Sequence, residues 1–487
     1  MNWPTVAVEL ALCAGVLGLL LADALLGPAK KQAIWKLALG GVLVLGGVLW
    51  WQRPWIGQTF QPMAAGQPMF VLDAFAWTFK WLFLLTMLVV ILMTRVFTRR
   101  SGANVGEFYL LLYSALLGML VLVSVHDLLL LFIGLELLTF SLYVMAAYLK
   151  TDARSIEAGL KYLILGSVSS GFLVYGISLL YGTVGATDFT TLRDAFATGQ
   201  MSLVAKAGMG LVLAGLGFKV AAVPFHLWVP DVYEGAPAPV VALLSVGSKM
   251  AGAVVLLRLL YSVFWPVQAM WGGILAVLSA ATMLYGNLAA IPQTNIKRLL
   301  GYSSIGHAGY LLMGLSTASP SGAQAVGYYL LAYLLGNLAA FFVVVVASQA
   351  VGSDRLEDYD GLSRRSPLLA ATLFVGLLSL AGVPPLAGFT GKLLVLLATV
   401  ESGRMWLVAI GAVNVAISLY YYLQVVRRMY LRPPATEGSP EARGTGSHTI
   451  PVDALTRAAL LALIGGILLV GIVQEPFLRV LSAAIRF

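Results

Sequence analysis

The stretch FKVAAVPFHLWVPDVYEGAPAP, residues 218–239, decides the fold. An apolar run of membrane-spanning length leads into it, carries Lys219, and meets Pro224 five residues later. Proline lacks a backbone N–H and clashes with the carbonyl four residues earlier, here that of Val220, so the helix is predicted to break beside its own charge. In a bilayer, non-helical backbone is tolerated only where it is buried in protein or lines a wet cavity. The stretch therefore predicts a membrane protein with a broken helix around a lysine.

The composition of the whole chain indicates that lipid is its solvent. Of 487 residues, 60% are hydrophobic and 10% are charged, against roughly 25% charged residues in ordinary soluble domains. This excludes a water-soluble globular protein. The single Cys13 excludes a disulfide framework, thiolate-held iron–sulfur clusters and four-cysteine zinc sites, and the four histidines are too dispersed for a haem pair. We expect no cofactor and no metal in this chain, so any redox chemistry has to occur in a partner.

Apolar runs of spanning length recur on both sides of the opening stretch. We predict an all-α polytopic membrane protein with about 14 transmembrane helices. The run at 367–400 is too long for one straight span and contains Gly382-Val383-Pro384-Pro385, so we interpret it as a second broken helix, helix 12, to match helix 7. The predicted helices cover 5–27, 34–51, 70–94, 107–124, 126–149, 160–181, 206–228, 238–262, 267–290, 298–317, 323–348, 367–400, 405–430 and 455–479.

The basic residues indicate which loops face the cytoplasm. Nineteen Lys and Arg residues fall in the connections after helices 1, 3, 5, 9, 11 and 13, and only five, Arg258 among them, fall in the opposite connections. By the positive-inside rule the first set is cytoplasmic and both termini face outward, on the periplasmic side. The net charge of +9 thus reflects the basic residues in the cytoplasmic loops, and we predict no nucleic-acid partner. The segment 431–454, rich in Pro, Gly, Ser and Thr, is predicted to be a mobile cytoplasmic loop.

Four lysines remain inside predicted spans: Lys80, Lys219, Lys249 and Lys392. A lysine at the centre of a span costs roughly 2.5–3.5 kcal/mol on the insertion scale, so it faces protein or water and marks a candidate functional site. Glu136 lies about 15 Å into helix 5 at 1.5 Å per residue and is a candidate counter-ion for a buried lysine. The structural alternatives are a protonated Glu136 that serves packing, a peripheral Lys80 that shares a helix face with Asp73, and amines that reach the headgroups at Lys249 and Lys392.

Three further residues are secondary candidates for a proton path. Lys161 opens helix 6, where an interfacial anchor is the alternative interpretation. His226 lies just beyond Pro224, and His307 lies in the helix at 298–317. Histidine titrates near neutral pH and can pass protons, although a lone histidine among apolar residues is more often a satisfied core residue.

An internal repeat is predicted from two weak matches. Val223-Pro224 and Val383-Pro384 interrupt apolar runs at an offset of 160, and GLKY at 159–162 resembles GYYL at 327–330. Five helices separate each pair, and an odd number of crossings inverts the second copy. The predicted units are an N-terminal three-helix segment, 1–100; a first five-helix repeat, 101–265; a second, inverted repeat, 266–430; the loop, 431–454; and helix 14, 455–487.

The string at 218–237, Ser248-Lys249 and GFTGK at 388–392 closely resemble the antiporter-like subunits of respiratory complex I, and within them subunit N, the bacterial counterpart of mitochondrial ND-two. In that family fourteen helices with inverted repeats, helices 7 and 12 broken, form a proton channel. The resemblance implies that Glu136 and Lys219 form a switchable ion pair, that Lys249 carries the proton along the midplane, and that Lys392 serves the exit. It also implies that residues on the polar axis include Lys161, His226 and His307, and that the helix breaks lie at Pro224, Pro384 and Pro385.

The resemblance implies a proton-translocating membrane subunit of a respiratory NADH:quinone oxidoreductase in the bacterial inner membrane. NADH, FMN, iron–sulfur clusters and quinone are then expected in partner subunits, and the expected partners are neighbouring antiporter-like subunits and small helical subunits. Two alternatives stay open. One is a subunit of a multisubunit sodium/proton antiporter on the same scaffold, and the other is a structural subunit that only anchors its neighbours.

Overall fold

Long apolar helices form nearly all of the described chain. The computed structural model describes residues 2–60, 67–101, 105–198, 201–433 and 449–485. Among these residues, twelve helices are long and apolar enough to cross a membrane. Two more predicted spans are helical but are more polar or shorter: α14, Ile296–Ser316, and the broken pair α17, Pro367–Ala381, with α18, Ala387–Glu401. The prediction of an all-α polytopic fold is confirmed.

The N-terminal segment contains three long helices and one small hairpin. Its elements are η1 Trp3–Val6, α1 Ala7–Leu25, α2 Pro28–Lys31, α3 Ile34–Trp51, η2 Arg53–Trp55, β1 Gln58–Phe60, β2 Phe70–Leu72 and α4 Ala74–Ser101. The two strands pair antiparallel, with Thr59 opposite Val71. The predicted span at 70–94 was therefore placed too early, because its first residues pair as a strand and the helix begins at Ala74.

The next section of the chain forms the first predicted repeat. Its elements are α5 Val105–Ser124, α6 Leu128–Ala146, α7 Ala153–Val184, α8 Phe189–Ala197, α9 Leu203–Val220, α10 Trp228–Gly235, α11 Ala238–Leu243, the π-helix η3 Leu244–Ser248, α12 Lys249–Arg258 and the π-helix η4 Leu259–Val263. Polar side chains cap the starts of four of these helices, among them α8, which Asp188 caps. Asp127 accepts from the first amides of α6, Asp152 caps α7 and Ser202 caps α9, each by satisfying N–H groups that lack a helical partner.

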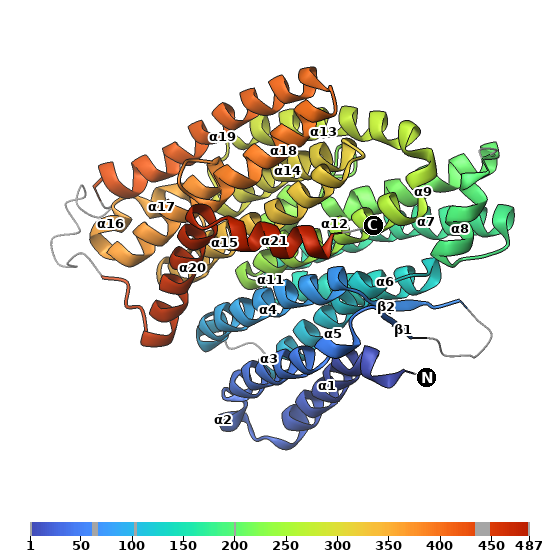
Figure 1. The fold of residues 1–487 in the computed structure, drawn as a ribbon. Helices are drawn as coiled ribbons and strands as arrows, with labels where there is room; N and C mark the ends of the chain where they lie inside the picture. Colours follow the sequence, from blue (N-terminus) through green and yellow to red (C-terminus); the bar gives the residue numbers. More distant parts are fainter. Residues whose placement is uncertain (1, 61–66, 102–104, 199–200, 434–448, 486–487) are drawn as a thin grey trace.

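The last section completes the bundle. Its remaining elements are η5 Trp265–Val267, α13 Gln268–Ala290, α15 Pro320–Val351, η6 Leu356–Tyr359, α16 Leu362–Arg365, α19 Met405–Leu431, α20 Ala454–Ile472 and α21 Glu475–Ala484. The predicted helix at 455–479 was too long, because the chain leaves α20 after Ile472 and restarts as the short α21 (Figure 1). The predicted mobile loop, 431–454, falls mainly on 434–448, which lie outside the described residues.

Both predicted helix breaks are present and have similar backbones. Helix α9 ends at Val220, and Ala221 adopts a left-handed conformation with φ 64° before the Val223–Pro224 bond. Helix α17 ends at Ala381, and Gly382 takes φ 88° before Pro384–Pro385. The chain resumes as α10 after the first break and as α18 after the second. The helices before the breaks, α9 and α17, therefore end inside the bundle.

Helix α15 forms the centre of the bundle, and its most apolar stretch is completely buried. It packs against α4, α11, α14, α17, α18 and α20, while α1 and α3 lie on one side of the molecule and α13 and α19 on the other (Figure 1). Pairs recur in the two halves: α5 packs on α6 as α13 packs on α14, and α7 packs on α9 as α15 packs on α17. This repeated order agrees with the predicted five-helix repeats, whose boundaries stay a prediction.

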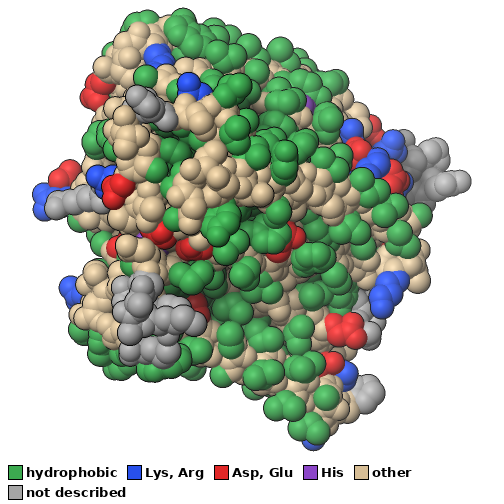
Figure 2. Space-filling view, turned by 90° about the vertical axis from the view of Figure 1, so that its right-hand side faces the viewer, with side chains coloured by type: hydrophobic (Ala, Val, Ile, Leu, Met, Phe, Trp, Pro, Cys, Tyr) green, Lys and Arg blue, Asp and Glu red, His purple; other side chains and the backbone are tan. Residues whose placement is uncertain are grey.

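Large apolar side chains also cover the outside of the molecule. Helix α7 exposes many of them, including Leu160, Val168 and Tyr175, and α1 and α3 do the same. Figure 2 shows hydrophobic side chains over much of the face seen from the end near α8, with charged side chains in small separate groups. A surface this apolar is suited to lipid or to other membrane subunits. The chain is therefore a multi-pass membrane protein.

Candidate functional site

Glu136 and Lys219 lie on neighbouring helices but each binds a hydroxyl group. Glu136, half-buried on α6, accepts a hydrogen bond from Ser170 Oγ at 2.5 Å. Lys219, at the end of α9, donates to Thr139 Oγ1 at 2.5 Å, and the Thr139 hydroxyl donates in turn to the Leu135 carbonyl. Within the described residues no direct ion pair joins Glu136 to Lys219. Thr139 follows Glu136 by three residues, so the hydroxyl that binds Lys219 and the Glu136 carboxylate lie on the same face of α6.

The break after α9 places Lys219 at a helix C-terminus. The carbonyls of a last helical turn lack helical partners and carry partial negative charge, which favours a cation at this end. Trp228 Nε1, from the start of α10, donates to the Phe218 carbonyl at 3.1 Å and closes part of this end. The Trp228 ring packs on that of Tyr162 from α7 with centroids 4.6 Å apart. Aromatic side chains therefore cover the end of α9, and the Lys219 amine lies 5.5 Å from the centre of the Phe218 ring.

Lys249 is buried where α12 begins, directly after a π-helical turn. Its amine donates to the Ser304 carbonyl at 2.8 Å and to Ser304 Oγ at 2.6 Å, both on α14. The amine also lies 5.9 Å from the centre of the Tyr233 ring. Tyr233 belongs to α10, so the second half of the broken helix and α14 enclose the Lys249 amine from two sides.

A second set of hydroxyl groups, which begins at the residue before Ser304, leads to His307. Ser303 on α14 shares a short hydrogen bond with the Tyr422 hydroxyl of α19. Tyr422 OH lies 3.3 Å from His307 Nε2, and Tyr329 OH lies 2.5 Å from His307 Nδ1. One nitrogen of a neutral imidazole donates and the other accepts, so a histidine with a hydroxyl on each side can pass a proton between them.

Lys392 lies at the second helix break. Its amine, on α18, donates to the Ala381 carbonyl at the end of α17 at 2.9 Å and lies 3.5 Å from Ser418 Oγ of α19. The ring of Tyr310 is 5.0 Å away. The lysine thus binds a carbonyl that the helix break has freed. In both halves of the chain, a buried amine lies beside the end of a broken helix.

Two predicted secondary residues lie away from this chain of contacts. His226 is buried at 5% exposure, neither ring nitrogen has a hydrogen-bond partner within the described residues, and its ring packs against Tyr285. Lys161 is part of a charged cluster, with its amine 2.7 Å from both Glu157 and Asp231.

The Lys161 cluster encloses a charged cavity of about 250 Å³. Arg298 pairs there with Asp231 at 2.8 Å and with Glu234 at 2.9 Å. A second cavity, of about 330 Å³, shares Arg154 and Glu234 with the first and extends to Lys297. Both cavities adjoin α10, whose Tyr233 hydroxyl lies 3.4 Å from Ser304 Oγ.

Two other charged residues have partners that differ from those expected. Lys80 is buried and pairs with Glu9 of α1 at 2.7 Å, not with Asp73. Asp73 pairs instead with Arg258, at 2.9 and 3.0 Å. The prediction that Arg258 lies in an outer connection was wrong: it is the last residue of α12 and is buried. Arg258 lies inside the predicted apolar run at 238–262, and this position could have identified it as a buried charge.

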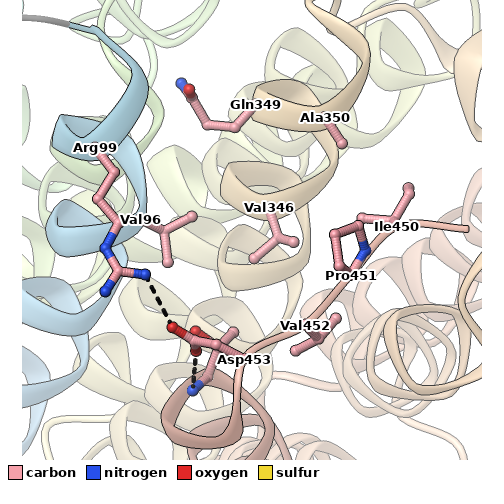
Figure 3. A pocket seen from close by; sticks show the side chains of 10 residues that line it. Val96, Arg99, Val346, Gln349, Ala350, Ile450, Pro451, Val452 and Asp453 are labelled. Carbon is pink, nitrogen blue, oxygen red and sulfur yellow. Dashed lines mark hydrogen bonds and ion pairs between the residues drawn. The ribbon is translucent and has the colours of Figure 1, made fainter.

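An acidic residue anchors α20 at the end of the bundle where α4 ends. Asp453 caps α20 through the Thr456 amide and pairs with Arg95 at 2.6 Å and Arg99 at 3.1 Å, both on α4. Burial opposes ionisation, but the hydrogen bonds from Thr456 and Arg95 outweigh it and hold the pKa of Asp453 below its ordinary value. Figure 3 shows Asp453 beside Arg99 at the edge of a pocket that also involves Val346. The described residues contain no cluster of ligands suited to a metal ion.

The chain is similar to known proteins over most of its length. Residues 125–418 match the family described as NADH:quinone oxidoreductase/Mrp antiporter, TM. The NADH-quinone oxidoreductase subunit N of Chlorobium chlorochromatii is 46% identical over 409 residues, which cover 81% of this chain and 79% of that one. The NADH-quinone oxidoreductase subunit N 2 of Solibacter usitatus is 40% identical over 490 residues, which cover 99% of this chain and 96% of that one.

Solved structures show the same fold. A chain of respiratory complex I from Thermus thermophilus with bound aureothin has a TM-score of 0.81 and 34% identity, with 98% of this chain and 100% of that chain covered. A chain of the Mrp complex from Dietzia sp. has a TM-score of 0.85 but 21% identity, with 100% and 97% covered. The second likeness shows a shared fold alone.

Proposed function

This chain belongs to the subunit N family of NADH-quinone oxidoreductases, and from that premise we propose that it moves protons across the membrane through its buried lysines. It is a membrane subunit of a translocating oxidoreductase that couples quinone reduction to proton pumping. We place NADH, FMN, iron–sulfur clusters and quinone in partner subunits. We also propose other antiporter-like subunits and small helical subunits as its neighbours in a bacterial inner membrane.

One observation carries the proposed path: three buried amines lack a carboxylate partner. Lys219, Lys249 and Lys392 are 3%, 1% and 3% exposed. Each donates to a hydroxyl or a carbonyl oxygen, and within the described residues none forms an ion pair. Lys80, in contrast, has Glu9 at 2.7 Å. A buried charge is stabilised chiefly by an opposite charge, so amines without one suit groups that take up and release protons.

In the proposed mechanism, Glu136 controls Lys219 through distance. Approach of a carboxylate favours the charged form of an amine, and withdrawal favours the neutral form. The Thr139 hydroxyl, which accepts from Lys219 in this state, holds the amine while Glu136 binds Ser170. Exchange of Thr139 for Glu136 as the partner of Lys219 would load a proton, and the reverse exchange would release it toward Lys249.

The proposed route continues across the second half. Lys249 passes the proton to Ser304, and the hydroxyls of Ser303, Tyr422 and Tyr329 with His307 provide the next positions. Lys392 then serves the exit toward the outside. Proton uptake from the cytoplasm near helices 7 and 8 is supported by the charged cavities beside α10. We therefore assign Lys161 to uptake, and retain His226 only as a secondary candidate.

The orientation of the chain is also part of the proposal. The distribution of Lys and Arg supports cytoplasmic loops after the odd-numbered helices and both termini on the outer side. The proposed repeats, 101–265 and 266–430, would then place the two broken helices in opposite orientations, which suits a path that opens to both faces.

The test uses the assembled complex in proteoliposomes. Glu136→Ala and Lys219→Ala are expected to impair both proton pumping and coupled quinone reduction, while Lys150→Ala, at an exposed loop position, leaves both near the parental value. NADH oxidation with an artificial electron acceptor confirms that the partner subunits are intact. If both variants assemble and pump fully, the roles of Glu136 and Lys219 are wrong. Sodium-dependent exchange without NADH would instead favour the antiporter function, for which the shared Mrp fold is the supporting observation.

A further inference from the structure

Arg258 joins three parts of the chain at the end of α12. Its guanidinium binds both oxygens of Asp73, at 2.9 and 3.0 Å, and donates to the Val123 carbonyl from Nε at 3.1 Å and from a terminal nitrogen at 2.7 Å. Its cation also lies 5.0 Å from the centre of the Phe75 ring. A two-pronged pair between guanidinium and carboxylate fixes orientation as well as distance, which a lysine cannot reproduce.

Both partners of Arg258 are themselves fixed. Asp73 precedes α4 and accepts from the Ala76 amide at 2.7 Å, which orients its carboxylate at the helix start. Val123 lies in the last turn of α5, where carbonyl groups lack a helical partner and favour a cation. Arg258 therefore attaches α12 to two rigid helix ends, one from the N-terminal segment and one from the first repeat.

Helix α12 has π-helical turns on both sides. The turn at Leu244–Ser248 precedes it, and the turn at Leu259–Val263 follows it. Such turns interrupt the regular hydrogen-bond ladder and are frequent at functional sites. The position of α12 along its axis and its rotation about that axis are therefore determined largely by the contacts that its own side chains make.

Polar contacts hold this segment at its two ends. Lys249 is its first residue and Arg258 its last, about 13.5 Å apart at 1.5 Å per residue. The residues between them, 250–257, are all apolar or glycine and are buried, and apolar packing has little directional preference. A Cβ added at Gly252 would lie 3.1 Å from Lys219 Cβ, so the same segment also packs closely on the first lysine of the proposed path.

We propose that Arg258, held by Asp73 and the Val123 carbonyl, is a positioning residue that fixes α12 and so places the Lys249 amine against Ser304. The inference rests on the proposed function, in which Lys249 carries a proton. A slide of one residue along the helix axis moves the Lys249 backbone by about 1.5 Å, and displacements of this size at a reactive group cost large factors in rate. Arg258 itself carries no proton in this scheme.

The test compares variants at both sides of the contact in the assembled complex. Arg258→Met is expected to lower the proton-pumping rate by about tenfold because the amine is misplaced. Asp73→Asn is expected to give a similar loss, and the double variant no further loss, because the two residues act as one unit. Arg258→Lys, which keeps the charge but not the two-pronged geometry, should recover part of the rate.

The pH profile separates positioning from a general structural role. The ionisable groups that interact with Lys249 are Tyr233, through its ring, and His307; those that interact with Arg258 are Asp73 and His126. If Arg258 positions Lys249, Arg258→Met shifts the pH optimum of coupled turnover in the same direction as Ser304→Ala, which removes the Lys249 hydroxyl acceptor.

The buried ion pair of Lys80 and Glu9 supplies the control, because its removal leaves every hydrogen bond of Arg258 and Asp73 in place. The double variant Glu9→Gln with Lys80→Met removes an ion pair that is more buried than that of Arg258 and Asp73, together with a cation that interacts with Asp73. Because the contacts of Arg258 remain, it is expected to keep the pumping rate within about twofold and the pH optimum unchanged. An assembled Arg258→Met complex with the rate and pH optimum of this control would overturn the inference. If that variant does not assemble, the same criterion applies to Arg258→Lys and Asp73→Asn.

Lys249→Ala, measured in parallel, separates this inference from the proposed function. Full pumping by Lys249→Ala would contradict the proton path itself. Loss of pumping in Lys249→Ala together with full pumping in the Arg258 and Asp73 variants would contradict the positioning role alone.

Discussion

Replacing Thr139 by valine tests the contact that holds the Lys219 amine. The substitution removes a buried hydroxyl that accepts from Lys219 at 2.5 Å and keeps the side-chain shape nearly constant. A hydrogen bond to a charged group contributes about 1.5–3 kcal/mol, and about 1.4 kcal/mol corresponds to a factor of ten. We therefore expect Thr139→Val to lower coupled turnover at least about tenfold, and Thr139→Ser to restore most of it.

A second threonine provides the matched control. Thr139 also donates to the carbonyl four residues before it, and Thr86 makes the same intrahelical bond to Leu82 at 2.8 Å in α4, where it is buried. Thr86→Val therefore removes an equivalent helix bond without touching Lys219. The assay is proton uptake into proteoliposomes, normalised to NADH oxidation with an artificial acceptor. Equal pumping by the assembled Thr139→Val and Thr86→Val complexes would refute the role of the hydroxyl.

Three other predictions concern separate parts of the molecule. Lys392→Met is expected to abolish pumping, because it removes the buried amine that donates to the carbonyl at the end of α17; retention of more than half of the rate would exclude an exit role. His307→Gln should impair pumping strongly because both ring nitrogens bind hydroxyls, whereas His226→Gln should change it less than about twofold, and the reverse order would contradict the proposed route. Asp453→Asn keeps a helix cap but loses the ion pairs to the buried Arg95 and the exposed Arg99. Because the carboxylate itself is partly exposed, the expected loss of stability is about 0.5 kcal/mol. Because the pKa of Asp453 is lowered by folding, this difference in thermal stability should be present at pH 7 and shrink as the pH falls below about 4; a difference that grows in acid would contradict the assignment.

The sequence predicts those features that depend on local chemistry. Pro224 and Pro384 interrupt their helices because proline removes a donor and clashes with the preceding turn, and the structure has breaks at both. Lys219 and Lys392 stand out because a charge inside an apolar run requires an internal explanation, and both amines are buried next to those breaks.

Partners from distant parts of the chain are not visible in a single sequence. Lys80 has Asp73 two helical turns away, yet it pairs with Glu9 of α1, which only the folding of the N-terminal helices against α5 brings near. The count of basic residues places Arg258 in a connection, whereas Asp73 pairs with it inside the bundle. Pairing across helices depends on packing, and no local pattern encodes it.

Details of helix geometry were also beyond prediction. The π-helical turns on both sides of α12 leave no periodic signal, since all their side chains are compatible with an ordinary helix. Likewise, the contact of Lys219 with Thr139 depends on how α6 and α9 pack, which the sequence does not specify. The family resemblance implies a switchable pair of Glu136 and Lys219, which stays a prediction, and in this structure each of the two groups binds a hydroxyl.

The number of protons pumped per NADH oxidised tests the central claim most directly. It should be measured in the assembled complex with Lys219, Lys249 and Lys392 all replaced by methionine, after normal subunit content and electron transfer to an artificial acceptor have been verified. If these amines carry protons, the ratio falls or coupled turnover stops. An unchanged ratio at an unchanged rate would show that this chain only anchors its neighbours.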